Sequence, residues 1–176
     1  MMINIPMIET SHLILRGHHP DDFVALKEIW EDQEVVKHIS GTPSTEQQSW
    51  MRLANYLGHW SLMGFGYWGI EEKSTGKYIG EIGFADFKRE ITPSITGIPE
   101  AGWILSSAVH GKGYGKEALK AVLDWSDKNL SFDKTVCIIN PENARSISLA
   151  EKCGYQKVCE TIFNGRATIL FERFRK

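Results

Sequence analysis

The spacing of apolar residues predicts two helices in the first third of the chain. Apolar side chains recur at the helical interval over residues 23–30, directly after a segment that carries two acidic residues suited to the positive end of a helix dipole. A second helix is predicted after Pro43, where the same interval returns. Ser44 and Gln47 have the spacing of a capping box for this helix, and Gly58 is expected to weaken its end.

Runs of β-branched and aromatic residues predict seven strands. The expected strands are residues 8–16, 66–71, 78–87, 100–106, 135–139, 155–163 and 166–174. Asn164-Gly165 separates the last two and is a strong signal for a hairpin turn. Two further helices are expected at residues 116–128 and 143–152, and Gly154 is expected to stop the second.

This order of elements predicts the fold class. Strands and helices are interleaved, which indicates a mixed α/β layer with helices on both faces of one seven-stranded sheet. Strand 100–106, helix 116–128 and strand 135–139 form a candidate βαβ unit, which would place a parallel pair at the centre of the sheet. No repeat or domain boundary interrupts the chain, so residues 1–176 are expected to form one domain.

Composition narrows the classes of function. Hydrophobic residues make up 42% and charged residues 24% of the 176 residues, which suffices for a packed core. The net charge of -2 and the lack of a long basic run argue against nucleic-acid or membrane-surface binding. No apolar stretch approaches the ~20 residues that span a bilayer. Residues 1–9 lack the pattern of a signal peptide, so a cytoplasmic protein is expected.

Cysteine and histidine usage argues against a disulfide framework and against a metal site. Cys137, Cys153 and Cys159 are odd in number and form no C-x-x-C pair, so we expect reduced and mostly buried thiols. The side chains of the adjacent residues His18 and His19 diverge, and no further ligands accompany them.

The most informative segment is a glycine-rich turn between a predicted strand and a predicted helix. Gly111, Gly113 and Gly115 alternate with other residues directly before the helix, and Lys112 and Lys116 add positive charge. The first turn of a helix carries amide groups without partners, and glycines let a phosphate approach them closely. The segment therefore predicts a phosphate site, although a merely flexible turn has the same composition.

Two other phosphate-binding motifs do not match this segment. The glycines lack the G-x-G-x-x-G spacing of a dinucleotide site and do not follow the first strand. Glu117 stands where a Walker A loop needs a hydroxyl group.

The loop and four other segments resemble one known family. His110, Gly113 and Gly115 follow the [QR]-x-x-G-x-[GA] signature of the GNAT (general N-acetyltransferase) superfamily, with His in place of Gln or Arg. Within that family, the branch that acetylates ribosomal-protein N-termini is similar in four more places. These are residues 10–16, 78–83, 143–146 and 150–155, in the expected order along the chain.

The resemblance implies a mostly antiparallel sheet and acetyl-CoA as the co-substrate. The diphosphate would lie on the loop, and the pantetheine arm would pass between strands 100–106 and 135–139, which splay apart. Leu105 and Ser106 would be its backbone partners, Asn143 would hold its end and Lys152 would reach a phosphate. The loop residues assigned to the diphosphate are His110, Gly111, Lys112, Gly113, Tyr114, Gly115 and Lys116.

Two of these assignments have plain structural alternatives. Asn143 has an equal claim to be a helix cap, and Asn140 competes for that position. Lys152 has the place of an ordinary solvated lysine on a helix.

In this family the amine attacks the thioester directly, so no enzyme nucleophile is required. We expect Glu100 to be the general base, acting through a water molecule, with Glu81 and Asp86 as alternatives. Many family members carry a tyrosine acid where this chain has Ala150, so Ser146 is the candidate acid; an ordinary first-turn helix serine explains it equally well.

The resemblance leaves the acceptor open. A primary amine is expected, on a small molecule or at a protein N-terminus, and the protein is expected to be a monomer or a homodimer. Trp50, Trp60, Tyr67 and Trp68 would line an acceptor cleft or pack in the core. A non-catalytic acyl-CoA-binding module is the alternative function, and a different nucleotide-binding enzyme is a more remote one.

Overall fold

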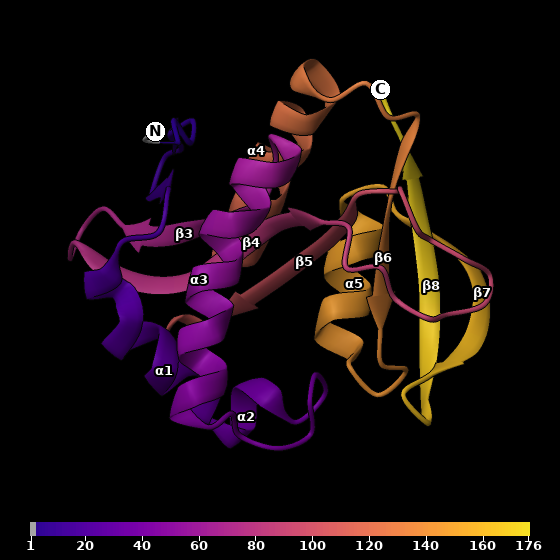
Figure 1. Ribbon diagram of the computed structural model, residues 1–176, viewed down its shortest axis with the longest axis horizontal. Coiled ribbons are helices and arrows are strands. Elements are labelled where there is room, and N and C mark those ends of the chain that lie inside the picture. The colour runs from indigo at the N-terminus through magenta and orange to yellow at the C-terminus, as the bar shows by residue number, and fades with distance from the viewer. Residues whose placement is uncertain (1–2) are drawn as a thin grey trace.

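The computed structural model describes residues 3–176 and shows an open sheet covered by helices (Figure 1). The helices are α1 Phe23–Glu31, α2 Gln33–Val36, α3 Glu46–Met63, α4 Tyr114–Asn129 and α5 Ala144–Lys152, with short 3-10 turns η1 Pro20–Asp22 and η2 Ser107–Val109. The strands are β1 Ile8–Glu9, β2 Leu13–Arg16, β3 Tyr67–Glu72, β4 Lys77–Ala85, β5 Glu100–Leu105, β6 Lys134–Ile139, β7 Gln156–Phe163 and β8 Arg166–Phe174.

The strands form one mixed sheet in the order β1-β2-β3-β4-β5-β6-β8-β7. Every neighbouring pair is antiparallel except β5 and β6, which run parallel. The predicted α/β class, the mostly antiparallel sheet and the central parallel pair are therefore confirmed.

The sheet has eight strands, so the prediction of seven was wrong. The expected first strand over residues 8–16 is broken at Thr10–His12, and β1 folds back to pair with β2. The amide of Thr10 donates to the carbonyl oxygen of Leu13, and Glu117 of α4 accepts hydrogen bonds from Thr10 and His12. These polar contacts reverse the chain where the hydrophobic pattern alone suggested a continuous strand.

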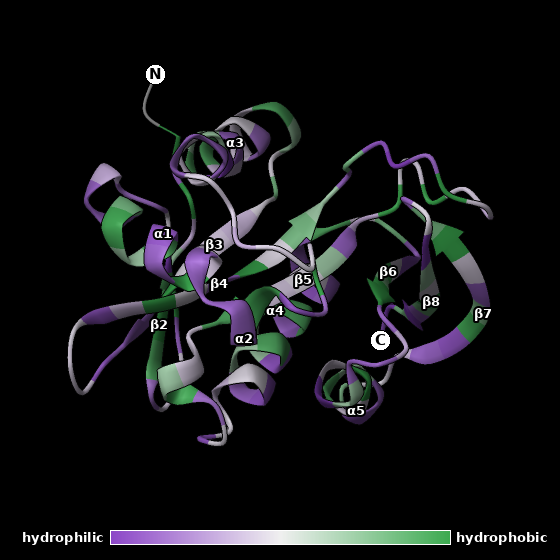
Figure 2. Ribbon diagram, turned by 90° about the horizontal axis from the view of Figure 1, so that it is seen from below, coloured by the Kyte–Doolittle hydropathy of each residue, from purple (hydrophilic) through white to green (hydrophobic). Residues whose placement is uncertain are grey.

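The helices cover both faces of the sheet, as predicted. Figure 2 shows α1 and α3 on one side and α4 and α5 on the other. Trp68, Ile82 and Leu119 belong to the apolar core on the α4 side, and Leu26 and Tyr67 to the core on the α1 and α3 side. Because neighbouring strand residues point to opposite faces, Tyr67 and Trp68 enter different cores.

The start of α3 differs from the prediction by one residue. Thr45 and Gln48 form the capping box of α3, in place of Ser44 and Gln47. The amide of Ser44 instead donates to the carbonyl oxygen of Trp30, which holds the chain one residue short of the cap position.

Further differences concern the end of α3 and the start of α4. Gly58 does not end α3, which continues to Met63 and closes at Gly64 in the left-handed conformation. Helix α4 begins at Tyr114, two residues before the predicted start, and short α2 was not predicted at all.

The parallel pair separates almost as soon as it forms. Glu100 of β5 is opposite Val136 of β6, and the amide of Val136 donates to the carbonyl oxygen of Pro99. No other register pair joins the two strands within the described chain, and they diverge towards their carboxyl ends (Figure 2). The sheet thus has an internal edge where backbone groups of β5 lack a neighbouring strand.

Two glycine-to-alanine substitutions should have opposite effects on stability. A Cβ at Gly83 would lie 2.2 Å from the backbone oxygen of Gly66, so Gly83→Ala should push β3 and β4 apart and destabilise the fold by about 3 kcal/mol. Gly58→Ala adds a Cβ with no atom within 4 Å in α3, and should stabilise by about 1 kcal/mol. Urea denaturation measures both, and equal midpoints for the two variants would contradict the close approach at Gly83.

Candidate active site

A cleft of about 1240 Å³ opens where β5 and β6 separate. Its walls come from α3, β4, β5, β6, α5 and the β7–β8 hairpin. Three of the predicted site residues line it: Glu100, Asn143 and Ser146. The glycine-rich turn and Lys152 do not line this cleft; the turn follows the far end of β5.

The glycine-rich turn has the backbone conformation that the phosphate prediction requires. Gly111 and Gly113 have φ values of 85° and 80°, and Gly113 is the N-cap of α4. The amides of residues 114–116 form the first turn of α4 and therefore have no acceptor within the helix. A 16-residue helix also directs the positive end of its dipole at this point.

Two predicted side chains of the turn brace it against the sheet. Lys112 Nζ lies 3.1 Å and Tyr114 Oη 2.8 Å from Oε1 of Glu72, at the end of β3. These hydrogen bonds lower the pKa of the Glu72 carboxyl, Tyr114 contributing most. Lys116 and Lys152 are exposed.

The expected backbone partners of the cofactor arm need a correction. The amide of Ser106 donates to the carbonyl oxygen of Ile79 at 2.8 Å, so Ser106 faces β4 and not the splayed edge. Because strand residues alternate in the direction of their backbone groups, Ala101, Trp103 and Leu105 face that edge instead. Leu105 therefore keeps its predicted position, although His110 Nε2 already donates to its carbonyl oxygen at 3.1 Å.

Asn143 and Ser146 stand at the start of α5, across the gap from β5. Asn143 is the N-cap of this helix, and its Oδ1 accepts from the amide of Ser146 at 3.2 Å. Its competitor Asn140 accepts from Glu142 in the preceding turn. The Ser146 hydroxyl accepts from the indole nitrogen of Trp103 at 3.2 Å, so the Trp103 side chain reaches from β5 to α5.

Glu100 is buried at the point where β5 and β6 part. Its side chain is 6% exposed and accepts two hydrogen bonds from Arg89, at 2.7 and 3.0 Å. Burial raises the pKa of the Glu100 carboxyl, and the Arg89 guanidinium acts in the opposite direction. Arg89 in turn packs over the rings of Phe87 and Phe163.

Glu81 is the second carboxylate of the cleft and lies on β4. It is fully buried and accepts hydrogen bonds from Trp30 Nε1 and from the hydroxyl groups of Tyr56 and Tyr78. Burial raises the pKa of Glu81, and these three donors oppose that effect. His18 continues the network, stacking on Tyr56 at 4.7 Å and contacting Tyr78 Oη at 3.2 Å.

Tyr67 places a hydroxyl group directly over β5. A Cβ on Gly102 would lie only 2.0 Å from Tyr67 Oη, so this hydroxyl rests on the strand where only glycine leaves space. The Tyr67 ring stacks on Tyr56 with centroids 4.9 Å apart, and burial raises the pKa of Tyr67 so that it stays protonated. Among residues 3–176 its hydroxyl has no hydrogen-bond partner, and it lines the cleft.

The chain was compared with known proteins. Residues 12–156 match the family described as acetyltransferase (GNAT) domain. The chain belongs to the GNAT acetyltransferase family. An uncharacterized N-acetyltransferase, p20 of Bacillus licheniformis, is 30% identical over 149 residues, which cover 84% of this chain and 81% of that protein.

Solved structures of the family share the whole fold. A GNAT-family acetyltransferase from Bordetella pertussis, at 28% identity, superposes with a TM-score of 0.85 over 96% of this chain and 99% of that one. A spermidine N-acetyltransferase from Vibrio cholerae, solved with CoA and spermine, has 18% identity and a TM-score of 0.74 over 94% and 97%. Ribosomal-protein acetyltransferases are also among the structural neighbours, at 20% identity or less, and at that distance the likeness shows the fold alone.

Within this acetyltransferase fold, the aromatic residues divide between core and cleft. Trp60 and Trp68 are buried in the core on the α4 side, and Trp50 is half exposed outside the cleft. Of the four predicted aromatics only Tyr67 lines the cleft.

Three cleft residues with polar roles were missed in the sequence: Trp30, Tyr56 and Arg89. No motif marked them. Trp30 and Tyr56 lie on helices and contact Glu81 of β4, and Arg89 lies in a loop and contacts Glu100 of β5. Asp86, an alternative base, instead holds the loop after β4 through Lys88 and Gly97.

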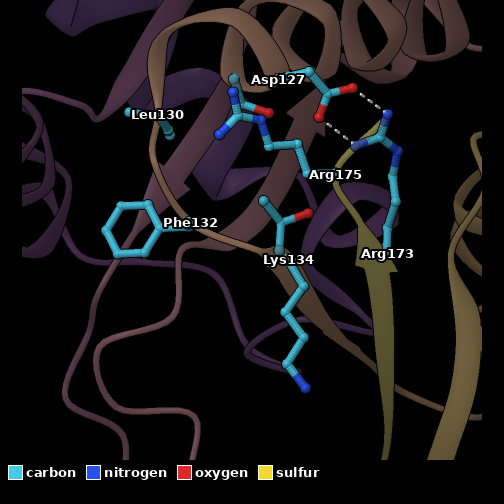
Figure 3. Close-up of a pocket in the computed structure, with 8 residues that line it drawn as sticks. Asp127, Leu130, Phe132, Lys134, Arg173 and Arg175 are labelled. Atoms are coloured by element: carbon cyan, nitrogen blue, oxygen red, sulfur yellow. Dashed lines mark hydrogen bonds and ion pairs between the residues drawn. The ribbon is translucent and has the colours of Figure 1, made fainter.

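The cysteines are reduced in the structure, and Cys137 is one of the residues that line the cleft. Cys137 and Cys153 are buried and Cys159 is half buried, all as free thiols. Within residues 3–176 no three His, Cys, Asp or Glu side chains are grouped to hold a metal, and no described helix is long and apolar enough to cross a membrane. A small cavity beside the ion pair of Asp127 and Arg173 (Figure 3) has a volume of about 10 Å³, which is room for one water molecule.

Proposed function

We propose that the protein is an acetyl-CoA-dependent N-acetyltransferase acting on a primary amine. The observation that supports this most directly is the combination of a left-handed glycine turn at the N-terminus of α4 with the separation of β5 from β6. The turn offers amides to a diphosphate, and the internal edge offers backbone groups to an amide-bearing arm, in the manner of an added strand.

The length of β5 is consistent with this placement. Leu105 is three positions after Gly102, a rise of roughly 10 Å along a strand. An arm that starts at the turn and follows the backbone of Leu105, Trp103 and Ala101 brings its thioester end towards Glu100 and the Tyr67 hydroxyl. His110, Gly111, Gly113, Gly115 and Lys116 would then surround the diphosphate, and Asn143 the outer part of the arm.

Glu100 is the general base of this proposal, acting through a water molecule. An alkylammonium, with a pKa of ~10.4, cannot attack the thioester carbonyl, so it must lose a proton before the C–N bond forms. Each carboxylate oxygen of Glu100 accepts one hydrogen bond from Arg89, which leaves each oxygen a further lone pair. Glu81 is more fully occupied, because three donors already share its two oxygens.

Two hydroxyl groups can assist the leaving thiolate and the developing oxyanion. Ser146 faces the cleft with its oxygen held by Trp103, and its proton remains available for donation. Tyr67 adds a second donor on the opposite side of β5 that the sequence motifs did not indicate. Donors fixed in advance at the reacting carbonyl contribute to catalysis without reorganisation during the reaction.

Acetyl-CoA binding and thiol release test the proposal together. Calorimetry should show binding of acetyl-CoA, and addition of a primary amine should release CoA thiol in proportion to acetylated amine found by mass spectrometry. Binding without turnover on any amine would support the non-catalytic acyl-CoA-binding module instead. Binding of ATP, with no binding of acetyl-CoA, would overturn both.

A further inference from the structure

Two carboxylates and three arginines line the cleft. The carboxylates are Glu81, which accepts hydrogen bonds from three uncharged donors, and Glu100, which is paired with Arg89. Arg52 and Arg166 also line the cleft, and neither has a carboxylate partner within 4 Å among residues 3–176. The arginines of the cleft therefore outnumber its carboxylates, and Arg52 and Arg166 keep N–H donors available for a ligand.

Arg52 is held in a fixed position by a stacking contact. Its guanidinium carbon lies 3.4 Å from the ring centroid of Trp30, a cation–π geometry, and Nη1 donates to the Ser44 hydroxyl at 3.3 Å. This leaves most of its five N–H donors without a protein partner. A planar guanidinium that is fixed in this way presents a fork that matches a carboxylate in bidentate geometry.

Arg52 is also close to the proposed reaction centre. It lies one helical turn before Tyr56 on α3, so the two Cβ atoms are roughly 6 Å apart. The Tyr56 hydroxyl and the Trp30 indole both donate to Glu81, and the Tyr56 ring stacks on Tyr67. A small molecule can therefore contact Arg52 at one end and present an amine at Tyr67 and Gly102 with the other.

The cleft also has an aromatic wall. Tyr67 and Phe87 pack edge to face with centroids 6.2 Å apart, and both line the cleft together with Phe163. Such a wall favours an acceptor with an apolar body. A polyamine is disfavoured, because its further ammonium groups would lie beside the like charge of Arg52.

We propose that the acceptor is a primary amine that carries a carboxylate on a short apolar body, as in an apolar amino acid, and that Arg52 binds this carboxylate. This inference rests on the proposed acetyltransferase function and names the acceptor class of that site. Arg166 instead donates to the carbonyl oxygen of Ile39 at 2.9 Å and joins the β7–β8 hairpin to the segment after α2.

Matched pairs of amines with and without the carboxylate test this inference. Thiol release is measured with phenylalanine against phenethylamine, leucine against isoamylamine, and spermidine. The carboxylate-bearing member of each pair should have at least a roughly 10-fold higher kcat/KM. Arg52→Gln should lower that kcat/KM roughly 10- to 100-fold and leave the decarboxylated amines and acetyl-CoA binding unchanged.

Arg175→Gln is the control, because Arg175 is exposed near the C-terminus and does not line the cleft. This substitution should leave kcat/KM unchanged for both amines of each pair. A preference for decarboxylated amines or spermidine, or an Arg52→Gln effect equal on both members, overturns the inference. The inference is also overturned if only peptides are acetylated and Arg52→Gln does not change their kcat/KM.

Acetyl-CoA binding, measured on the same samples, separates this inference from the proposed function. If acetyl-CoA does not bind, the proposed function fails. If it binds but no amine turns over, titration of phenylalanine into the CoA-saturated protein, followed by tryptophan fluorescence, decides the inference. Binding that Arg52→Gln abolishes supports it, and the absence of such binding overturns it.

Discussion

Gly113→Glu should weaken acetyl-CoA binding by at least about 100-fold while the protein stays folded. Gly113 has a φ of 80° and is the N-cap of α4, and a Cβ there meets no atom within 4 Å. The fold therefore suffers only backbone strain of roughly 1–2 kcal/mol. A diphosphate, in contrast, would face a carboxylate in place of amides, and would lose charge-assisted hydrogen bonds worth about 1.5–3 kcal/mol each. Calorimetry with acetyl-CoA measures the change.

Gly64→Glu is the matched control for this substitution. Gly64 closes α3 with a φ of 74° and equally open surroundings, so it receives the same side chain at the same kind of backbone strain. It should lower the melting temperature at least as much as Gly113→Glu and leave acetyl-CoA affinity unchanged. Equal affinities for the two variants would show that the turn before α4 does not hold the cofactor.

Glu100→Gln should lower kcat/KM for the amine roughly 100- to 10,000-fold, the range of a general base, with acetyl-CoA affinity preserved. Glutamine keeps the shape and one acceptor oxygen for Arg89 but cannot take a proton from the incoming ammonium. Since burial raises the pKa of Glu100, the acidic limb of the kcat/KM profile should lie above pH ~4.5, and this limb should vanish in the variant.

The pair of Asp127 and Arg173 provides a control for the loss of an ion pair as such. Asp127 accepts two hydrogen bonds from Arg173, at 2.9 and 2.7 Å, in the same bidentate manner as Glu100 accepts from Arg89 (Figure 3). Asp127→Asn should reduce stability and leave kcat/KM unchanged. If Glu100→Gln has no larger kinetic effect than Asp127→Asn, the role of Glu100 is structural, and Glu81 becomes the candidate base.

Most of the fold could be predicted from local pattern. Helical spacing over residues 23–30 and the Asn164-Gly165 turn depend on neighbours in the chain, so they survive in the structure. The break at Thr10–His12 could not be predicted, because it depends on Glu117, more than a hundred residues away. Short α2 was missed for a similar reason: four residues carry too little periodicity to be recognised.

In the site, too, features set by consecutive residues could be predicted, and those set by distant residues could not. The conformation of the glycine turn could be predicted, because it depends on consecutive residues, and Gly113 has the positive φ that glycine favours. The partner of Glu100 could not be predicted from the sequence. Arg89 comes from a loop without periodicity, and its guanidinium packs over the rings of Phe87 and Phe163. The wrong assignment of Ser106 has a simpler cause, which is that one residue of register reverses the side to which a strand's backbone points.

By itself, the sequence determined the family, most of the order of the elements and the turn before α4, because these follow from local propensity and from consecutive residues. Only the tertiary structure decided which partners each charged group of the cleft has. Glu81 and Glu100 read alike as acids on neighbouring strands, but each is occupied by partners from distant segments, and Arg52 is left with donors to spare. Whether a charged side chain is free to bind a ligand depends on the residues packed around it, and folding brings these together from distant parts of the chain.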